Sequence, residues 1–545
     1  TGKDVVAGFM VRTPLFFGFD SVVSELFADE RQRPVSPGPV VDDDLNSWSY
    51  YGSNVIAVAP ERTSENETFL AINSHQPWEG PVTWYEAHVH SEEGWNMAGG
   101  LFPGAPIILH GHNENLGWGF TVNSPDMVDV FVLDINPDNP DQYWFDGAWR
   151  DLEVDEAEIT VRLLGRLRWN VKREILWSVY GPTVRQPHGT YALRYGTMGE
   201  VDLVQSWYEL NKAADFASWQ EIFFASDMPM FNVGYADREG NIYYLYNARL
   251  PLRAEGYDWE QYLPGNSSAT LWTEYLPPEQ LPQVLNPASG FIQNANSSPF
   301  QTTVGPENPD PAGFSPTFGI ESYMTNRALR LLALFGDGAP LSFEQFTTYK
   351  YDITYAEESI VAELWQRLLA EDFSGDPATA TAQEILATWD RQADPDSPAA
   401  ALMMLTLYFV NERDGVDLHA SRLVGGEVPA AELTAAFNEA IAHLNEHFAG
   451  PGTPWSTVNR LERGDLNLGL GGGPDLPHAV YGQFNDAGQI IGGNGDSFVM
   501  LVRWNEAGQV SSYSIHQYGS ATAVPDSPHY NDQAPLFVNR ELKPV

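Results

Sequence analysis

The hydrophobic pattern changes twice along this chain. From residue 53 to about residue 300, short apolar and β-branched runs alternate with turn residues, as in antiparallel strands. Residues 322–448 instead repeat apolar positions at helical spacing, and the strand pattern returns after Pro454. The clearest helical stretches are Met324–Phe335, Glu357–Ala370 and Glu432–Phe448, the last ending near Gly450. Strands on both sides of a helical segment predict one α+β body rather than independent domains.

Hairpins can be placed at three points in the strand-rich parts. Asn54–Ala59 and Phe69–Ile72 are apolar runs separated by a turn, which predicts an antiparallel hairpin with Ser53 at its start. Two further predicted hairpins have turns at Asp237–Asn241 and Glu506–Gly508; the second joins Ser497–Trp504 to Val510–His516.

Residues 1–52 are expected to precede the main body. They contain an apolar stretch, Val5–Phe19, and then a Pro-rich and Asp-rich spacer, Pro34–Asp44, whose composition is typical of an exposed, cleavable linker. The chain begins at Thr1 without a leader of the signal-peptide type, so we expect a mature or internal piece of a longer precursor.

The charge excludes several classes of partner. The chain carries 73 acidic and 29 basic residues, for a formal net charge of −44. A nucleic acid or an anionic membrane surface requires clustered lysine and arginine, so neither is expected as a partner. Only five of the basic residues are lysines, a composition that suits a marine or halophilic source or an acidic extracytoplasmic enzyme. The most apolar run, Met403–Val410, is too short to span a membrane.

The absence of cysteine excludes disulfides, thiolate nucleophiles and cysteine-bound zinc. Ser53 is then a candidate nucleophile, because it follows a glycine at the start of a strand and behind a cleavable spacer. If the Gly52–Ser53 bond is cut, Ser53 gains an α-amino group with an ordinary pKa of about 7.7–8.0, which suits a general base. Nucleophile and base would then be on one residue.

Six blocks of sequence, in order, resemble the penicillin acylase family of N-terminal nucleophile hydrolases, which includes acyl-homoserine lactone acylases. The resemblance covers about residues 53–540. The blocks are Ser53–Val58, Asn73–Trp78, Gly111–Asn113 with Trp118–Thr121, Asp126–Asp129, Asn294–Pro299 and His529–Gln533.

The resemblance implies a four-layer αββα sandwich, with a helical insertion at about residues 340–450 and a catalytic chain at 53–545. It also implies roles for site residues. Ser53 would be the nucleophile, the backbone N–H of Val122 and the side-chain amide of Asn296 would stabilise the oxyanion, and His75 would lie near the serine amine. Arg327 would orient Asn296, with Arg330, one turn further on, as the alternative. Without the resemblance, Asn296 would be a turn residue, Val122 a strand residue, Arg327 a surface charge and His75 a core histidine.

The resemblance also implies a calcium site. Asp126, Asp129 and the carbonyls of Val128 and Pro251 match positions that bind calcium in penicillin acylases, and oxygen atoms are the ligands that Ca²⁺ prefers. Another carboxylate ligand belongs to the family's upstream chain. Two solvated aspartates at a turn are the simpler alternative. No organic cofactor is expected.

Two other functions compete with this one. His443, Glu446 and His447 fit the H-x-x-E-H pattern of a zinc peptidase, although histidines in the last turn of a helix are also stabilised by its dipole. The 17 tryptophans and 24 tyrosines could instead form a non-catalytic binding surface, although most such aromatics pack in cores.

The expected activity is hydrolysis of a linear N-acyl amide through an acyl-enzyme. Acyl-homoserine lactones are the first choice of substrate and acylated β-lactams the second. Gln76 stands where many relatives have an aromatic residue that lines the acyl pocket, so the acyl preference stays open. The expected partner is an upstream chain cut from the same precursor, in a periplasmic or secreted heterodimer.

Overall fold

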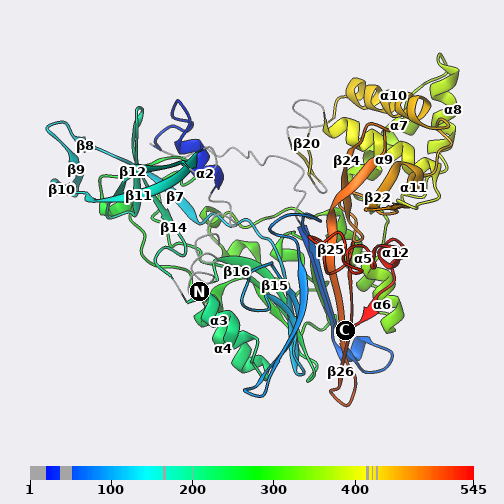
Figure 1. Cartoon of the computed structure of the whole chain (residues 1–545), viewed down its shortest axis with the longest axis horizontal. Helices are drawn as coiled ribbons and strands as arrows, with labels where there is room; N and C mark the ends of the chain where they lie inside the picture. Colours follow the sequence, from blue (N-terminus) through cyan, green and yellow to red (C-terminus); the bar gives the residue numbers. More distant parts are fainter. Residues whose placement is uncertain are drawn as a thin grey trace.

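The computed structural model describes residues 20–36, 52–163, 167–200, 202–226, 228–412, 417–419, 422–424 and 428–545. Two stacked sheets lie at the lower centre of Figure 1, a helical lobe at the upper right and an extended set of strands at the left. The apolar stretch Val5–Phe19 and most of the predicted spacer lie outside the described residues.

The larger sheet is built around two wholly buried strands, β1 (Gly52–Val58) and β2 (Thr68–His75). They pair antiparallel with Val55 opposite Ile72, which confirms the predicted hairpin. The other strands of this sheet are β19 (Phe291–Asn294), β25 (Ile490–Trp504), β26 (Val510–His516), β27 (Lys543–Pro544), β22 (Asn459–Arg463), β23 (Leu466–Gly469) and β24 (Val480–Phe484). Pairing of β25 with β26 confirms the hairpin predicted at Glu506–Gly508.

The second sheet packs face to face on the first. In order across the sheet its strands are β18 (Gln283–Leu285), β16 (Ile242–Ala248), β15 (Met230–Asp237), β6 (Leu116–Thr121), β5 (His110–His112), β4 (Trp95–Leu101) and β3 (Tyr85–Ser91). Because side chains alternate along a strand, Val55 and Ala57 of β1 face this sheet, whereas Ile56 and Val58 face away from it. The β15–β16 pairing confirms the hairpin predicted at Asp237–Asn241.

Helices cover the outer face of each sheet. The second sheet is covered by α3 (Leu203–Leu210) and α4 (Phe216–Ala225), whose Trp207 and Trp219 pack against Phe120 and Trp118 of β6 on that outer face. The larger sheet is covered by α5 (Asn326–Phe335), α6 (Phe343–Lys350) and α12 (Ala534–Val538). The layers are therefore α, β, β and α, and the predicted fold class is confirmed.

A further group of helices forms a lobe with its own hydrophobic core at one end of the larger sheet (Figure 1). They are α7 (Ile360–Ala370), α8 (Pro377–Leu386), α9 (Pro398–Asn411), α10 (Ala430–His447) and α11 (Trp455–Val458). The apolar run Met403–Val410 lies in α9, which is buried on almost every side. Helix α10 ends where Gly450 adopts a φ of 91° and donates to the Leu444 carbonyl, as a C-terminal glycine cap does. The exact limits of the helical insertion stay a prediction.

Most strands outside the two main sheets form the extension at the left of Figure 1. One group comprises β11 (Glu153–Leu163), β12 (Leu167–Trp177), β13 (Pro182–Gln186), β14 (Gly189–Tyr195), β7 (Val128–Leu133) and β17 (Leu263–Pro264). Strands β20 (Asp417–His419) and β21 (Arg422–Val424) instead pair beside the helical lobe. In the extension a smaller sheet joins β8 (Ile135–Asn136), β9 (Asn139–Phe145) and β10 (Ala148–Asp151). Helix α2 (Asp20–Leu26) packs here, with Leu26 buried beside Tyr191 and Tyr262.

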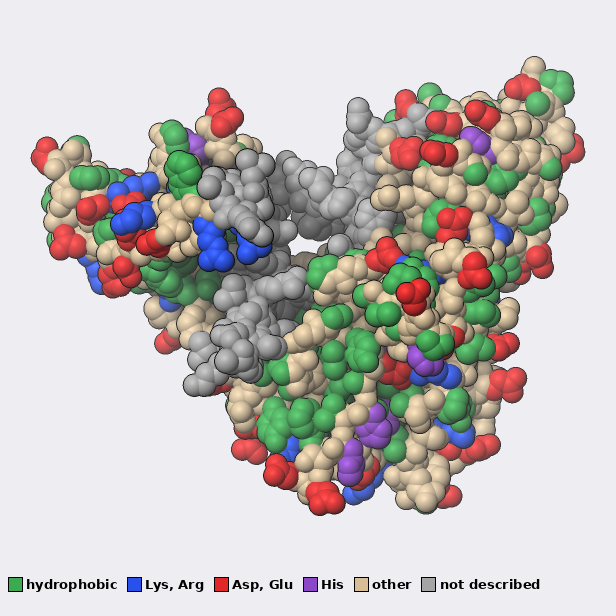
Figure 2. All heavy atoms as spheres, viewed as in Figure 1, with side chains coloured by type: hydrophobic (Ala, Val, Ile, Leu, Met, Phe, Trp, Pro, Cys, Tyr) green, Lys and Arg blue, Asp and Glu red, His purple; other side chains and the backbone are tan. Residues whose placement is uncertain are grey.

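The described surface agrees with the acidic composition. Figure 2 shows Asp and Glu side chains spread over the visible face of the body and lobe, with fewer Lys and Arg between them. Within the described ranges, no helix has the length and apolar character needed to cross a membrane.

Candidate active site

Ser53 lies at the start of β1, and its side chain is directed into the layer between the two sheets. Two residues further on, Val55 faces that layer, and alternation along the strand gives Ser53 the same face. Ser53 is 4% exposed, and its Oγ donates a hydrogen bond to the carbonyl of Gly52. In this uncut chain the hydroxyl is therefore held against the peptide bond that precedes it.

Asn296 binds the backbone of Ser53 from the loop after β19. Its φ of 58° is in the left-handed region, which asparagine tolerates better than most residues. Its Oδ1 accepts a hydrogen bond from the Ser53 N–H at 2.7 Å, and its Nδ2 donates to the carbonyl of Val122 at 2.8 Å. The amide group of Asn296 is thus placed between Ser53 and the backbone at the end of β6.

Arg327, in the first turn of α5, contacts both of these residues. Its Nη1 donates to the Ser53 carbonyl at 2.7 Å and to Asn296 Oδ1 at 3.1 Å, while its Nε pairs with Asp475 Oδ1 at 3.0 Å. A guanidinium group can only donate, so it fixes Asn296 with the oxygen toward Arg327 and the NH₂ toward Val122. Arg330 is directed elsewhere, to Asp352, with a contact of 2.9 Å.

His75 is at the end of β2, directly across the strand pair from Gly52. Its Nε2 is 3.1 Å from Asn73 Oδ1 and 3.1 Å from Asp496 Oδ1. Two acceptor oxygens require that Nε2 carries the proton, which leaves Nδ1 as an unprotonated acceptor. A Cβ built on Gly52 would lie 3.1 Å from this Nδ1, so Nδ1 faces the junction before Ser53 and any larger residue at 52 would crowd it.

A buried charged cluster lies behind His75. Asp496 Oδ2 is 2.5 Å from Lys350 Nζ, and it is 2.8 Å from His478 Nδ1. Burial by itself would raise the pKa of Asp496, but the Lys350 ammonium and the donors His478 and His75 hold the pKa of that carboxyl well below its usual range. Burial lowers the pKa of His75 to about 4 despite Asp496, so His75 is neutral at pH 7.

The structure therefore brings together Ser53, His75, Asn296, Arg327 and the backbone of Val122, and the catalytic roles expected of them stay predictions. Asp496, Lys350 and His478 were not predicted from the sequence. A weak signal existed, because Lys350 is one of only five lysines in the chain and lies at the end of a helix between two tyrosines. Nothing in the sequence indicated which carboxylate it would meet.

The residues of the expected calcium site are arranged around an arginine. Arg253 Nη2 is 2.8 Å from Asp126 Oδ1, and Arg253 Nε is 3.0 Å from Asp129 Oδ2. Among the described residues there is no group of three or more His, Asp or Glu side chains that could hold a metal ion. Both carboxylates are engaged by a protein cation, and this arrangement does not fit a calcium site.

The zinc motif on α10 is also engaged by protein groups. His443 Nε2 is 2.7 Å from the Gly488 carbonyl, and the ring packs beside Phe409 and Phe484. The ring of His447 lies 4.7 Å from that of His443, but no described third ligand joins them. These histidines therefore pack the C-terminal end of α10 against the loop at Gly488.

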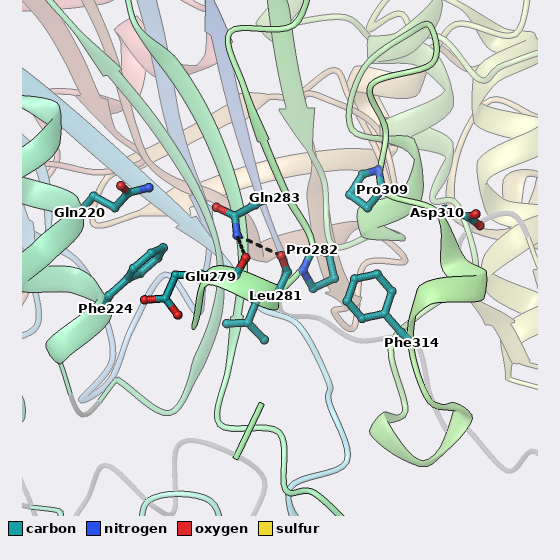
Figure 3. Close-up of a pocket in the computed structure, with 9 residues that line it drawn as sticks. All are labelled: Gln220, Phe224, Glu279, Leu281, Pro282, Gln283, Pro309, Asp310 and Phe314. Atoms are coloured by element: carbon teal, nitrogen blue, oxygen red, sulfur yellow. Dashed lines mark hydrogen bonds between the residues drawn. The ribbon is translucent and has the colours of Figure 1, made fainter. Parts of the chain in front are cut away.

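A surface pocket of about 480 Å³ lies apart from these residues (Figure 3). It is lined by Gln220, Phe224, Glu279, Leu281, Pro282, Gln283, Pro309, Asp310 and Phe314. None of its lining residues belongs to the cluster around Ser53, and its two carboxylates lie among apolar rings and prolines.

Comparison with known proteins identifies the family. A sequence model described as penicillin amidase matches residues 12–545. The chain belongs to the penicillin amidase family. It is 23% identical over 542 residues to the acyl-homoserine lactone acylase PvdQ of Pseudomonas fluorescens (strain Pf0-1), a match that covers 90% of this chain and 68% of that protein. It is 28% identical over 248 residues to penicillin G acylase of Escherichia coli, covering 45% of this chain and 29% of that protein.

A solved structure supports the same fold. The thermostable penicillin G acylase from Alcaligenes faecalis is similar with a TM-score of 0.64, 20% sequence identity, and coverage of 90% of this chain and 96% of that chain. At this identity the likeness establishes the N-terminal nucleophile hydrolase fold alone. Membership of the penicillin amidase family, with relatives named as acylases, supports an enzyme that hydrolyses acyl amides and disfavours both the zinc peptidase and the non-catalytic binding protein.

Proposed function

We propose that this chain hydrolyses N-acyl amides with Ser53 as its nucleophile, after cleavage of the Gly52–Ser53 bond. The observation that carries the proposal is the convergence on Ser53: its hydroxyl donates to the Gly52 carbonyl, its N–H to Asn296, and its carbonyl accepts from Arg327. A hydroxyl held against the preceding carbonyl can add to it. The C–N bond then breaks, the nitrogen takes the hydroxyl proton, and water hydrolyses the resulting ester. The products are a Gly52 carboxylate and a free Ser53 amine.

The same groups would serve the acyl-amide substrate. The freed amine of Ser53, with an ordinary pKa of about 7.7–8.0, accepts the hydroxyl proton as the oxygen attacks the acyl carbonyl. The oxyanion would be stabilised by Asn296 Nδ2 and the N–H of Val122, and Arg327 supports this role because it turns the NH₂ of Asn296 toward Val122. The amine product leaves with the proton, and water releases the acid from the acyl-serine.

Acyl-homoserine lactones are the substrate class that we favour, with acylated β-lactams second. The favoured class is suggested by His75 and by relatives named as acyl-homoserine lactone acylases. Such an activity would inactivate signalling lactones. Gln76, which follows His75, is 4% exposed, and its Oε1 has no hydrogen-bond partner among the described residues. If Gln76 lines the acyl pocket as the aromatic residue of relatives does, this acceptor would favour acyl chains that carry a hydrogen-bond donor.

We further propose that the active form is a heterodimer. Its parts would be an upstream chain and the chain that begins at Ser53, both cut from one precursor and located in the periplasm or outside the cell. The described part of residues 20–36 supports an association that survives cleavage, because Leu26 is buried beside Tyr191 and Tyr262 and Ser36 donates to the Tyr262 carbonyl at 2.7 Å.

Replacing Ser53 by alanine tests the mechanism. We expect the S53A chain to stay uncut and to lose turnover on a panel of acyl-homoserine lactones and acylated β-lactams, assayed by amine release at low and high salt. Ser206→Ala is the matched control, because Ser206 is a buried serine on α3 whose hydroxyl donates to the Asp202 carbonyl, within the same turn of chain. N-terminal sequencing of the active wild-type protein should give a chain that starts at Ser53. A different start, or turnover by S53A, would refute the proposal.

A further inference from the structure

The guanidinium group of Arg253 lies between two aspartates that the family resemblance assigns to calcium. Its Nη2 and Nε pair with Asp126 and Asp129, and its Nη1 donates to the carbonyl of Thr317. The side chains of Arg253 and Asp129 are both 0% exposed. Each nitrogen of the guanidinium therefore has an acceptor, as a buried arginine requires.

These contacts join three separate segments. Asp129 is near the start of β7 and Asp126 lies two residues before that strand. Arg253 is two residues after Pro251, and Thr317 is in the short helix η7 (Pro316–Phe318). The guanidinium also lies 5.4 Å from the ring centre of Trp259. A bound calcium ion holds segments together in the same way, by attracting carboxylate and carbonyl oxygens from several parts of a chain.

Positive charge from the protein itself already lies at this site. Asp129 also accepts a hydrogen bond from Trp272 Nε1 at 2.6 Å, and a second arginine, Arg194, lies opposite Asp129 on β14 with its guanidinium 4.7 Å from the Trp272 ring. Arg253 contacts both carboxylates, whereas Arg194 is a nearby positive charge that donates to the carbonyls of Trp272 and Tyr180. A divalent cation added here would be repelled by Arg253 at short range.

We propose that Arg253 is the structural cation of this site and takes the place of a bound calcium ion, so that folding of this chain requires no calcium. Asp129 Oδ1 has no hydrogen-bond partner among the described residues. Because an unpaired carboxylate oxygen is able to bind a metal ion, the experiments must include added metal ions. Cleavage of the Gly52–Ser53 bond should then also be independent of calcium. That consequence rests on the proposed function, whereas the role of Arg253 in folding does not.

The first experiment compares the melting temperature of the wild-type protein in chelator and in millimolar Ca²⁺, with Mg²⁺ at the same concentration as the control for screening of the −44 charge. We expect the two divalent ions to give equal shifts. We also expect no terbium luminescence sensitised by Trp259 or Trp272. A calcium-specific rise that Asp129→Asn abolishes would overturn the proposal.

The second experiment removes the cation. In Arg253→Ala the two aspartates lose their counter-ion, so the melting temperature should fall by several degrees in chelator and recover with Ca²⁺ but not with Mg²⁺. Sensitised terbium luminescence should appear, and the added change Asp129→Asn should remove it. Arg253→Lys keeps one positive charge and should gain no calcium response, and neither should Arg249→Ala, which breaks a partly exposed pair with Glu200.

Each outcome of these experiments supports or contradicts the proposal that Arg253 replaces a calcium ion. If Arg253→Ala folds and gains no calcium response, the site is not a cation site and the proposal is wrong. If Arg253→Ala does not fold, the wild-type titration alone decides, because a calcium-specific response there contradicts the proposal and equal responses to Ca²⁺ and Mg²⁺ support it. Melting temperature and luminescence do not depend on turnover, so failure here differs from failure of the proposed activity.

Discussion

Lys350 and Asp496 form an ion pair in which both side chains are 0% exposed, with Lys350 Nζ 2.5 Å from Asp496 Oδ2. The pair connects the end of α6 to β25, and it lies beside His75 at the candidate active site. Charges in the interior are costly unless they are paired, so the two groups stabilise each other's charged form. Asp496 in turn keeps the proton of His75 on Nε2 and leaves Nδ1 free toward Gly52.

Removing one partner of this pair should destabilise the fold strongly. We expect Lys350→Met to lower the free energy of unfolding by about 3–5 kcal/mol, because Asp496 is left as a buried, uncompensated charge. Adding Asp496→Asn should cost less than the sum of the two single changes. Denaturant unfolding of the uncut S53A chain would measure both effects in one covalent species.

The exposed pair of Lys172 with Glu156 is the matched control for that measurement. Its side chains are 65% and 56% exposed at a distance of 2.6 Å. Lys172→Met should therefore change the free energy of unfolding by less than about 1 kcal/mol. Equal effects of the two lysine changes would contradict the importance given to the buried pair.

Asn296→Asp should reduce turnover while the fold is kept. The substitution conserves shape but replaces the NH₂ that faces Val122 with an oxygen, which repels both the Val122 carbonyl and a developing oxyanion. We expect turnover to fall by about 10²–10³-fold, the usual effect of losing one oxyanion donor. The measurement is the rate of amine release per molecule with a free Ser53 terminus.

Asn286→Asp gives the comparison for that experiment. Asn286 also has a left-handed backbone, with φ 46°, but it lies at the end of β18 and its side chain bonds Ile242 and Asn241. We expect normal turnover from this variant. A cleaved Asn296→Asp enzyme that is as active as Asn286→Asp would rule out the role given to Asn296.

Stability should fall steeply in mild acid because of buried histidines. Burial lowers the pKa of His110 to about 3 and that of His112 to about 4, against an ordinary value of about 6.5. Below pH 6.5 the unfolded chain binds protons that the folded chain does not, so stability is complete above that pH and is lost as the pH falls toward 3. Each histidine contributes a slope of up to about 1.4 kcal/mol per pH unit.

His110→Phe tests this dependence on one group. The His110 ring stacks with Trp84 at 4.2 Å and with Phe498 at 5.6 Å, so a flat apolar ring should keep the packing. The free energy of unfolding, measured between pH 4 and pH 7, should then vary less steeply than in the wild type. An unchanged slope would show that His110 is not a source of the acid sensitivity.

Much of the fold followed from local pattern. Strand and helix periods depend on neighbouring residues, so the β1–β2 hairpin and helix α10 could be predicted from Asn54–Ile72 and Glu432–Gly450. The direction in which each side chain of a helix points was harder to predict. Arg327 and Arg330 are three residues apart and differ by about 60° around the helix axis, a difference too small for sequence to decide which one meets Asn296.

The sequence by itself determined the order of strands and helices, the acidic surface, and a serine after glycine at the start of a buried strand. Each of these depends only on composition or on residues that are neighbours in the sequence. The tertiary structure decided which charges meet. Lys350 and Asp496 are 146 positions apart, and Arg253 is more than a hundred residues from Asp126 and Asp129. Such pairs form because a buried charge must find a partner, and that requirement fixes neither the partner nor its distance along the chain.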